Sequence, residues 1–285
     1  MSIKTNRAAT SWRQSMWCLL VAVGLTACSQ TPYQAPMDTA PSVPLAAAEP
    51  EPAPLAESTL GTQWGEERES NVRSVHTTRL SPDSPQAIAQ MRYSDENSLR
   101  RALGRKANRQ NNVLLAHGKV EWSVRDEQGR PLPIFSRHGN RDYIVAGHDG
   151  ERYELVYVNR SNRTYEVIAT VDGLDVITGQ PGSVHNNGYI LSPGETLRID
   201  GFRKSQHEVA AFRFAAKDLA YANNTPAGDA RNIGVIGSAL FEVCMDGPDG
   251  CTRHSHHPRT KPSDRPNPFP GDPAGTYAPP PQYRR

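Results

Sequence analysis

The chain has 285 residues, of which 36% are hydrophobic and 22% charged, and its mean hydropathy is -0.63. No apolar run reaches the roughly 18 residues needed to span a bilayer, which excludes a polytopic membrane protein. Of its 24 prolines, seven lie in 29–58 and nine in 258–285. Because proline-rich segments do not bury a core, we expect one ordered domain between two disordered ends.

The N-terminus has the pattern of a secretion signal. Met1–Arg13 contains three basic residues and no acidic ones, and the apolar run Met16–Ala27 follows it. This run is too short for a transmembrane helix and has the length of a signal-peptide core. We therefore expect 1–27 to be a signal peptide.

The residues at the end of this signal, Leu25-Thr26-Ala27-Cys28, resemble the lipobox of bacterial lipoproteins. The resemblance implies cleavage before Cys28, transfer of a diacylglyceryl group to its thiol, and N-acylation, for example by palmitate. Two or more acyl chains would hold the protein permanently at a membrane. Ser29 stands where the family's inner-membrane retention residue is Asp, which favours the outer membrane of the cell envelope. The alternative is an ordinary cleaved signal with an incidental cysteine.

Cleavage would also change the net charge. The whole chain carries 32 basic and 30 acidic residues, a formal charge of +2. Removing Met1–Ala27 takes away three basic residues, which leaves 29 against 30. A charge near zero gives no electrostatic attraction to nucleic acid, so we expect no nucleic-acid partner.

Two segments precede the expected domain. Residues 28–58 read as an extended Pro/Ala-rich tether. Residues 59–112 form a polar segment in which Ser84-Pro85, followed by Ile88 and Met91, predicts one short helix. A second helical pattern follows Asp95, with apolar residues at Leu99, Ala102, Leu103 and Ala107.

From residue 113 the apolar period changes from about 3.6 to 2, which predicts strands. Val120, Trp122 and Val124 alternate with polar residues, and short turns such as Asp172-Gly173 separate the strand candidates. Eight or nine short strands without intervening helices predict an antiparallel sandwich or barrel, and we expect a β-sandwich over 113–251. The candidates are Val120–Val124, Leu132–Ser136, Tyr143–Ala146, Tyr153–Asn159, Thr164–Val171, Gly188–Leu191, Thr196–Phe202, Glu208–Ala215 and Ile233–Val243.

Two apolar stripes are the expected core of this sandwich. One contains Tyr165, Val167, Ala169 and Val171, and the other Ala210, Phe212 and Phe214. The runs Val171–Val176, Gly188–Gly194 and Ile199–Arg203 resemble a β-sandwich segment of uncharacterised bacterial envelope proteins, which implies a fold and no activity.

Cys244 and Cys251 are separated by six turn-forming residues. An exported protein occupies an oxidising compartment, and such a turn brings two cysteines within disulfide reach. We therefore predict a Cys244–Cys251 disulfide.

The alternative for this region is a metal site, because His254, His256 and His257 follow the second cysteine. Imidazole and thiolate bind zinc or copper, but the spacing of the two cysteines is wider than in common structural zinc sites. Without a bound metal, we expect residues 252–285 to be a disordered His/Pro-rich tail.

Two further groups invite functional interpretations. Asp172 and Asp175 form a carboxylate pair, although Asp-Gly after a strand is more often a turn. Arg198, Arg203 and Arg213 alternate with apolar residues, so they are expected on one exposed sheet face that would suit an acidic or glycan partner.

These observations predict a lipid-anchored cell-envelope protein that displays one β-sandwich for binding or structural interaction, with no cofactor and no catalytic residues. The first alternative is a metal-handling lipoprotein that uses His254, His256 and His257. The second is a hydrolase with a carboxylate-based site.

Overall fold

The computed structural model describes residues 57–103, 107–137, 141–245, 266–271 and 276–283, all within the unit Ala53–Arg285. These residues form two sheets that enclose a shared apolar core, which confirms the predicted, mainly β sandwich. Among these described residues, the first one in a strand is Leu60.

Sheet A has seven strands: β1 (Leu60–Glu69), β5 (Val113–Leu115), β6 (Val120–Asp126), β9 (Arg152–Asn159), β13 (Thr196–Ile199), β14 (Gly201–Arg203) and β15 (Glu208–Ala216). Its order is β1-β15-β9-β6-β5, with β13 beside β9 and β14 beside β15. β9 and β15 pair directly only at Tyr153 with Phe212 and Arg152 with Arg213. Farther along, β13 pairs with β9 and β14 pairs with β15. The sheet therefore divides into two branches at Asp200, between β13 and β14, and we call this point the fork.

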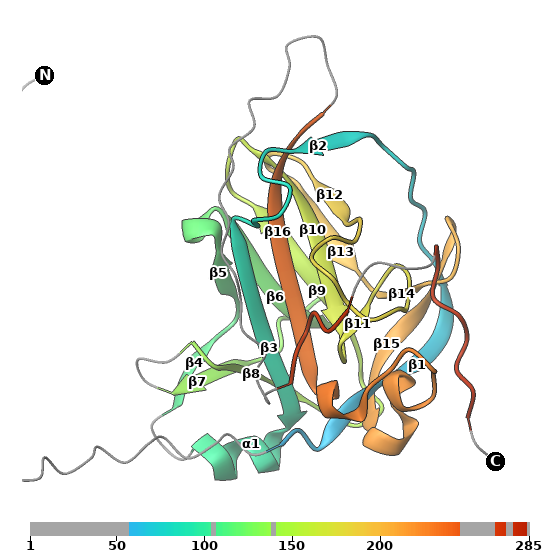
Figure 1. Ribbon diagram of the computed structural model, residues 1–285. Coiled ribbons are helices and arrows are strands. Elements are labelled where there is room, and N and C mark those ends of the chain that lie inside the picture. The colour runs from blue at the N-terminus through green and yellow to red at the C-terminus, as the bar shows by residue number, and fades with distance from the viewer. Residues whose placement is uncertain (1–56, 104–106, 138–140, 246–265, 272–275, 284–285) are drawn as a thin grey trace, which may run out of the picture. The chain divides into compact units, whose positions relative to one another are not determined.

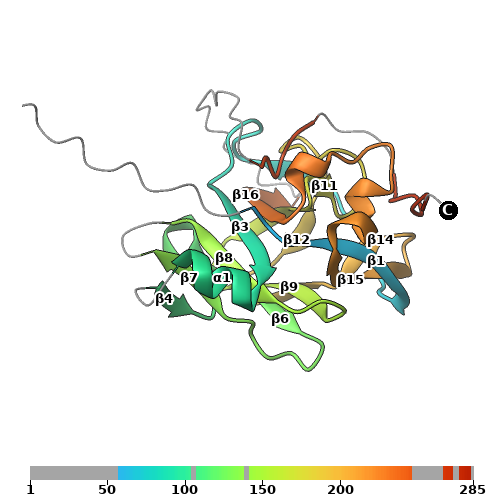
Figure 2. The same ribbon diagram turned by 90° about the horizontal axis from the view of Figure 1, so that it is seen from below.

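Sheet B has nine strands: β2 (Thr77–Arg79), β3 (Ala87–Asp95), β4 (Ala107–Gln110), β7 (Ile134–Arg137), β8 (Tyr143–Gly147), β10 (Thr164–Val171), β11 (Leu174–Asp175), β12 (Tyr189–Leu191) and β16 (Val235–Met245). Its order is β11-β10-β16-β3-β8-β7-β4, with β12 beside β10 and β2 beside β16. The pair of β3 and β8 is parallel, which departs from the predicted all-antiparallel arrangement. Figures 1 and 2 show β3 and β16 in one layer and β6 and β9 in the other.

The helical elements are short: α1 (Glu96–Leu103), η2 (Ala116–Gly118), η3 (Lys217–Leu219), η4 (Tyr221–Asn223) and η5 (Ala230–Asn232). The helix predicted after Asp95 is confirmed as α1. Asp95 Oδ1 accepts a hydrogen bond from the Ser98 amide at 2.9 Å, and Leu99 is buried. The pattern extends too far, however, because Ala107 begins β4.

Aromatic rings fill the space between the sheets. The rings of Trp122 and Tyr157 stack with centroids 5.8 Å apart, and Tyr153 stacks on Phe214 at 4.2 Å. Both predicted core stripes are buried, and all of their residues except Ala210 belong to the core shared by the two sheets. Intervening residues such as Ile168 and Ala211 are buried as well, so these strands are covered on both faces.

The helix predicted from Ser84-Pro85 is wrong. The residues after it form β3, which pairs with β16 on one side and with β8 on the other. Met91 and Tyr93 alternate into the core, whereas Ile88 is exposed. The offset of three between Ile88 and Met91 is therefore not a helical face, because pairing with two distant strands outweighs a weak local helix signal.

The two sheets also draw on more of the chain than 113–251. β1 to β4 come from the expected polar segment 59–112, and β1 belongs to sheet A. Parts of the expected disordered tail pack against the sheets: the Ala278 amide donates to the Arg203 carbonyl at 2.9 Å, and Phe269 contacts an apolar cluster around Phe241. Apolar contacts of this kind order short stretches of a proline-rich segment.

Candidate functional site

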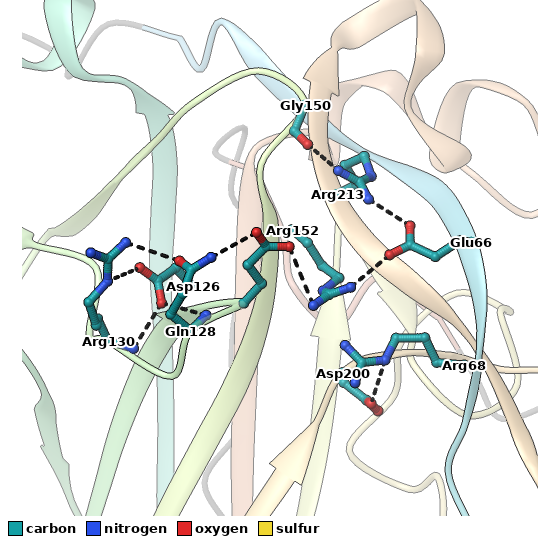
Figure 3. Close-up of polar contacts among 10 residues, drawn as sticks. Glu66, Arg68, Asp126, Gln128, Arg130, Gly150, Arg152, Asp200 and Arg213 are labelled. Carbon is teal, nitrogen blue, oxygen red and sulfur yellow. Dashed lines mark hydrogen bonds and ion pairs between the residues drawn. The ribbon is translucent and has the colours of Figure 1, made fainter.

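Charged side chains collect on the outward surface of sheet A, around the fork at Asp200. We define the charged face as Glu66 and Arg68 of β1, Glu127 of the turn after β6, Arg152 and Glu154 of β9, Arg198, Asp200, and Arg213 of β15. Figure 3 shows Arg152 between Glu66 and the turn after β6, and Arg213 above Glu66, so the two arginines approach different oxygens of one carboxylate.

A β-bulge places Glu66 on this surface. The register of β1 against β15 shifts between Trp64 and Glu67. At the bulge the backbones approach so closely that a Cβ on Gly65 would lie 2.6 Å from the Ala211 carbonyl oxygen, which only glycine accommodates. Trp64 points inward and contacts Phe202 and Tyr221. The bulge thus anchors one side chain in the core and directs the acidic one outward.

Glu66 bridges two arginines. Its Oε1 accepts from Arg152 at 2.9 Å and its Oε2 from Arg213 at 2.8 Å. Partial burial by itself would raise the pKa of Glu66, but the hydrogen bonds from Arg213 and Arg152 outweigh it and lower that pKa to about 2. The carboxylate is therefore ionised across the ordinary pH range and holds both guanidinium groups in place.

The pKa of Glu154 shifts in the opposite direction from that of Glu66. Burial raises its pKa, and the negative charge of Asp200 adds to this effect, while its ion pair with Arg198 opposes it. Asp200 in turn lies 3.8 Å from Arg68 Nε. Two acidic groups thus share the fork, and each has its own arginine.

A shallow hollow of about 280 Å3 opens at this point. Its lining contains Arg68, Arg152 and Arg198, and also Asp126, Glu127, Glu154 and Asp200. Asp126 closes the adjoining turn by accepting hydrogen bonds from the Gln128 and Arg130 amides. Because the charges nearly balance within the lining, the hollow presents fixed donors and acceptors rather than a strong field of one sign.

The structure separates the three arginines predicted to share an exposed face. Arg198 and Arg213 lie on the charged face, each beside a carboxylate. Arg203 does not, because it is only 3% exposed and its guanidinium donates to Ser70 and to the Tyr189 hydroxyl. The chain after β1 covers it, and alternation along β14 gives no sign of that cover.

The carboxylate pair Asp172 and Asp175 has structural roles. Asp172 and Gly173 have φ of 53° and 76° and make the turn between β10 and β11. Burial raises the pKa of Asp172 to about 6, although the Tyr93 hydroxyl and the Gly234 and Thr62 amides donate to it. Asp175 Oδ1 accepts from the Ile177 and Thr178 amides.

The predicted cysteine and histidine sites are untested. Cys244 lies in β16, 3.6 Å from the Thr78 carbonyl oxygen. Cys28, Cys251, His254, His256 and His257 lie outside the described residues, so lipidation, the disulfide and tail-bound metal stay predictions. Within 57–103, 107–137, 141–245, 266–271 and 276–283, no three metal-binding side chains come together.

Sequence reasoning missed Glu66, Arg152 and Asp200. The sequence pattern predicts no strand between Leu60 and Leu80. Leu60, Thr62 and Trp64 do alternate along β1, but the bulge at Gly65 interrupts the alternation before the charged residues. A glycine inside an alternating stretch is itself a bulge signal and was the one available clue.

Comparison with known proteins identifies no relatives of this chain, since no family model, curated protein or solved structure matches it. In the described part of the chain, no helix has the length and apolar character to cross a membrane.

Proposed function

We propose that this chain is a lipid-anchored protein of the bacterial cell envelope, which holds a β-sandwich away from the membrane to bind a partner. The observation that carries the proposal is Leu25-Thr26-Ala27-Cys28 at the end of a basic and apolar signal. Acylation of Cys28 would supply the anchor, and the proline-rich residues 28–58 would supply the spacer.

The position of the first strand supports the assignment of residues 28–58 to the spacer and of the following residues to the binding module. β1 begins at Leu60, two residues beyond the expected end of the tether. The module that follows has an aromatic core, which gives its surfaces a fixed geometry. On the charged face, Glu66 fixes Arg152 and Arg213, so donors and acceptors are arranged before a partner arrives. Such preorganisation lowers the entropy cost of binding.

Intact mass of protein extracted from membranes tests the anchor. We expect the mass of a chain that starts at Cys28 and carries a diacylglyceryl group and an N-acyl chain. Cys28→Ser should remove both modifications and move the protein from the membrane fraction to the aqueous fraction. Cys18→Ser, within the discarded signal, is the matched control and should leave mass and fractionation unchanged. A full-length chain with an intact Met1 in the aqueous fraction would overturn the proposal.

A further inference from the structure

A second surface has a different composition from the charged face. It lies where β3 of sheet B approaches β5 of sheet A. It is an open groove of about 800 Å3, against about 280 Å3 for the hollow at the fork. This volume is in the range of about 300–1,000 Å3 typical of ligand sites. Figure 1 shows β5 beside the upper half of β3.

Both walls of the groove contain incompletely paired strands. β5 is the last strand of sheet A in the described part of the chain and pairs only with β6. β3 pairs with β8 from Met91 to Asp95 only, so among the described strands the stretch Ala87–Gln90 has a partner on its β16 side alone. Strand edges of this kind present main-chain donors and acceptors to any extended chain that approaches.

The side chains suit a polypeptide. Ile88 and Leu114 are 54% and 62% exposed, a high fraction for large apolar side chains. The carboxamides of Gln90 and Asn112 lie among them, and such groups both donate to and accept from peptide bonds. The groove therefore combines apolar anchors with groups that match a peptide backbone.

The charge of the groove specifies the partner further. Arg141 and His117 belong to its lining, and none of the described lining residues is a carboxylate. The hollow on the charged face, by contrast, has four carboxylates in its lining. Charge complementarity favours an acidic segment in the groove and disfavours a basic one.

The end of β5 is held in an unusual conformation. Ala116 and His117, both of which line the groove, have φ of 47° and 58°. Residues other than glycine rarely adopt such values, which cost about 1 kcal/mol or more each and occur preferentially at functional sites. These two residues fix the rim of the groove beside the β5 edge.

We propose that this groove binds an extended, acidic polypeptide segment of a partner protein, which adds as a strand along the edge of β5, with Ala87–Gln90 as the opposite wall. This inference rests on the proposed role of the sandwich as a binding module and identifies the chemistry of its partner. The binding itself does not depend on the lipid anchor, so the two can fail separately.

The test uses the mature full chain in detergent and two fluorescent heptapeptides, SEVTVES and its basic counterpart SKVTVKS, followed by fluorescence anisotropy. We expect the acidic peptide to bind at least about tenfold more tightly than the basic one. Leu114→Glu should weaken acidic-peptide binding by at least about tenfold, because it replaces an apolar anchor with a repelling charge. Arg141→Gln should weaken it about threefold or more and leave the basic peptide unaffected.

The matched controls are Leu219→Glu, at an exposed leucine of η3 outside the groove, and Arg73→Gln, at an exposed arginine. Both should bind the acidic peptide within about twofold of the unmodified protein. Loss of binding in Leu219→Glu as well would show a general charge effect and overturn the proposal. So would equal binding of the two peptides, an absence of acidic-peptide binding, or binding that Leu114→Glu leaves unchanged. If the mass of the mature protein shows no acylation while these results hold, the anchor fails and the peptide site stands.

Discussion

Two carboxylates of this protein, Glu66 on the charged face and Asp172 in the core, accept hydrogen bonds from several donors, yet their acidities move in opposite directions. The pKa of Glu66 falls to about 2 and that of Asp172 rises to about 6. Glu66 has two guanidinium partners and contact with water. Asp172 has amide and hydroxyl donors only and is 1% exposed. The difference shows that full charges offset a modest desolvation, whereas neutral donors do not offset a complete one.

The core carboxylate also ties the two sheets together. Tyr93 of β3 donates to Asp172 and shares a hydrogen bond of 2.8 Å with the Thr62 hydroxyl of β1, which also lies 2.6 Å from the Tyr153 hydroxyl. The amides of Thr62 and Gly234 complete the set. Asp172 is thus the acceptor for groups from both sheets, whereas Glu66 joins neighbouring strands of one sheet.

The largest expected effect comes from removing the core acceptor. Asp172→Ala leaves three buried donors without an acceptor, each at a cost of about 1–3 kcal/mol, so we expect the free energy of unfolding to fall by about 3 kcal/mol or more. Urea unfolding of the mature protein measures it. Asp229→Ala, which removes the cap of η5 and a surface ion pair with Arg231, is the control and should cost about 1 kcal/mol. A similar loss in both variants would show that burial adds nothing to the role of Asp172.

The pH dependence of stability sharpens the comparison. The folded-state pKa of Asp172, about 6, lies above its ordinary value of 3.8, so the folded protein holds the proton more tightly. The part of the stability that comes from proton binding by Asp172 is full below the ordinary pKa and is lost as pH rises through about 6, a total of about 3 kcal/mol at 1.36 kcal/mol per pH unit.

In Asp172→Asn, the carboxamide that replaces the carboxyl group does not titrate in this pH range. The difference in unfolding free energy between the unmodified protein and Asp172→Asn should therefore fall as pH increases from 4 to 7. Glu66→Gln should show the reverse, because the contribution of Glu66 is present above its ordinary pKa of 4.5 and is lost as pH falls toward 2. Parallel pH profiles for the two variants would contradict the opposite shifts.

The smallest effect is expected at the charged face itself. A double-mutant cycle of Glu66→Gln and Arg213→Gln should give a coupling energy below about 1 kcal/mol, because both side chains are partly exposed and water screens the pair. The coupling should weaken in high salt. A coupling energy above about 2 kcal/mol, or one insensitive to salt, would mean that this ion pair is shielded from water as groups in the core are.

Much of the fold was predictable from local pattern. The alternation of Val120, Trp122 and Val124 located the inward face of β6, and Asp172-Gly173 located a turn. β3 was misassigned because its pairing partners are far away in the chain, in β16 and β8. The charged face was predictable only in part: Arg198 and Arg213 were correctly placed on an exposed surface, but Arg203 is covered by a segment 133 residues earlier.

In strands such as β6, the sequence by itself determined which side chains face the core, since a strand turns each successive residue to the opposite side. Its turns followed from local chemistry, because glycine and aspartate accept the left-handed backbone that a tight hairpin requires. Only the tertiary structure decided the acidity of the carboxylates and the exposure of the strand edges. Asp172 meets the amide of Thr62 across 110 positions of chain, and desolvation depends on everything packed around it. No local pattern contains that information, because a charge responds to its neighbours in space.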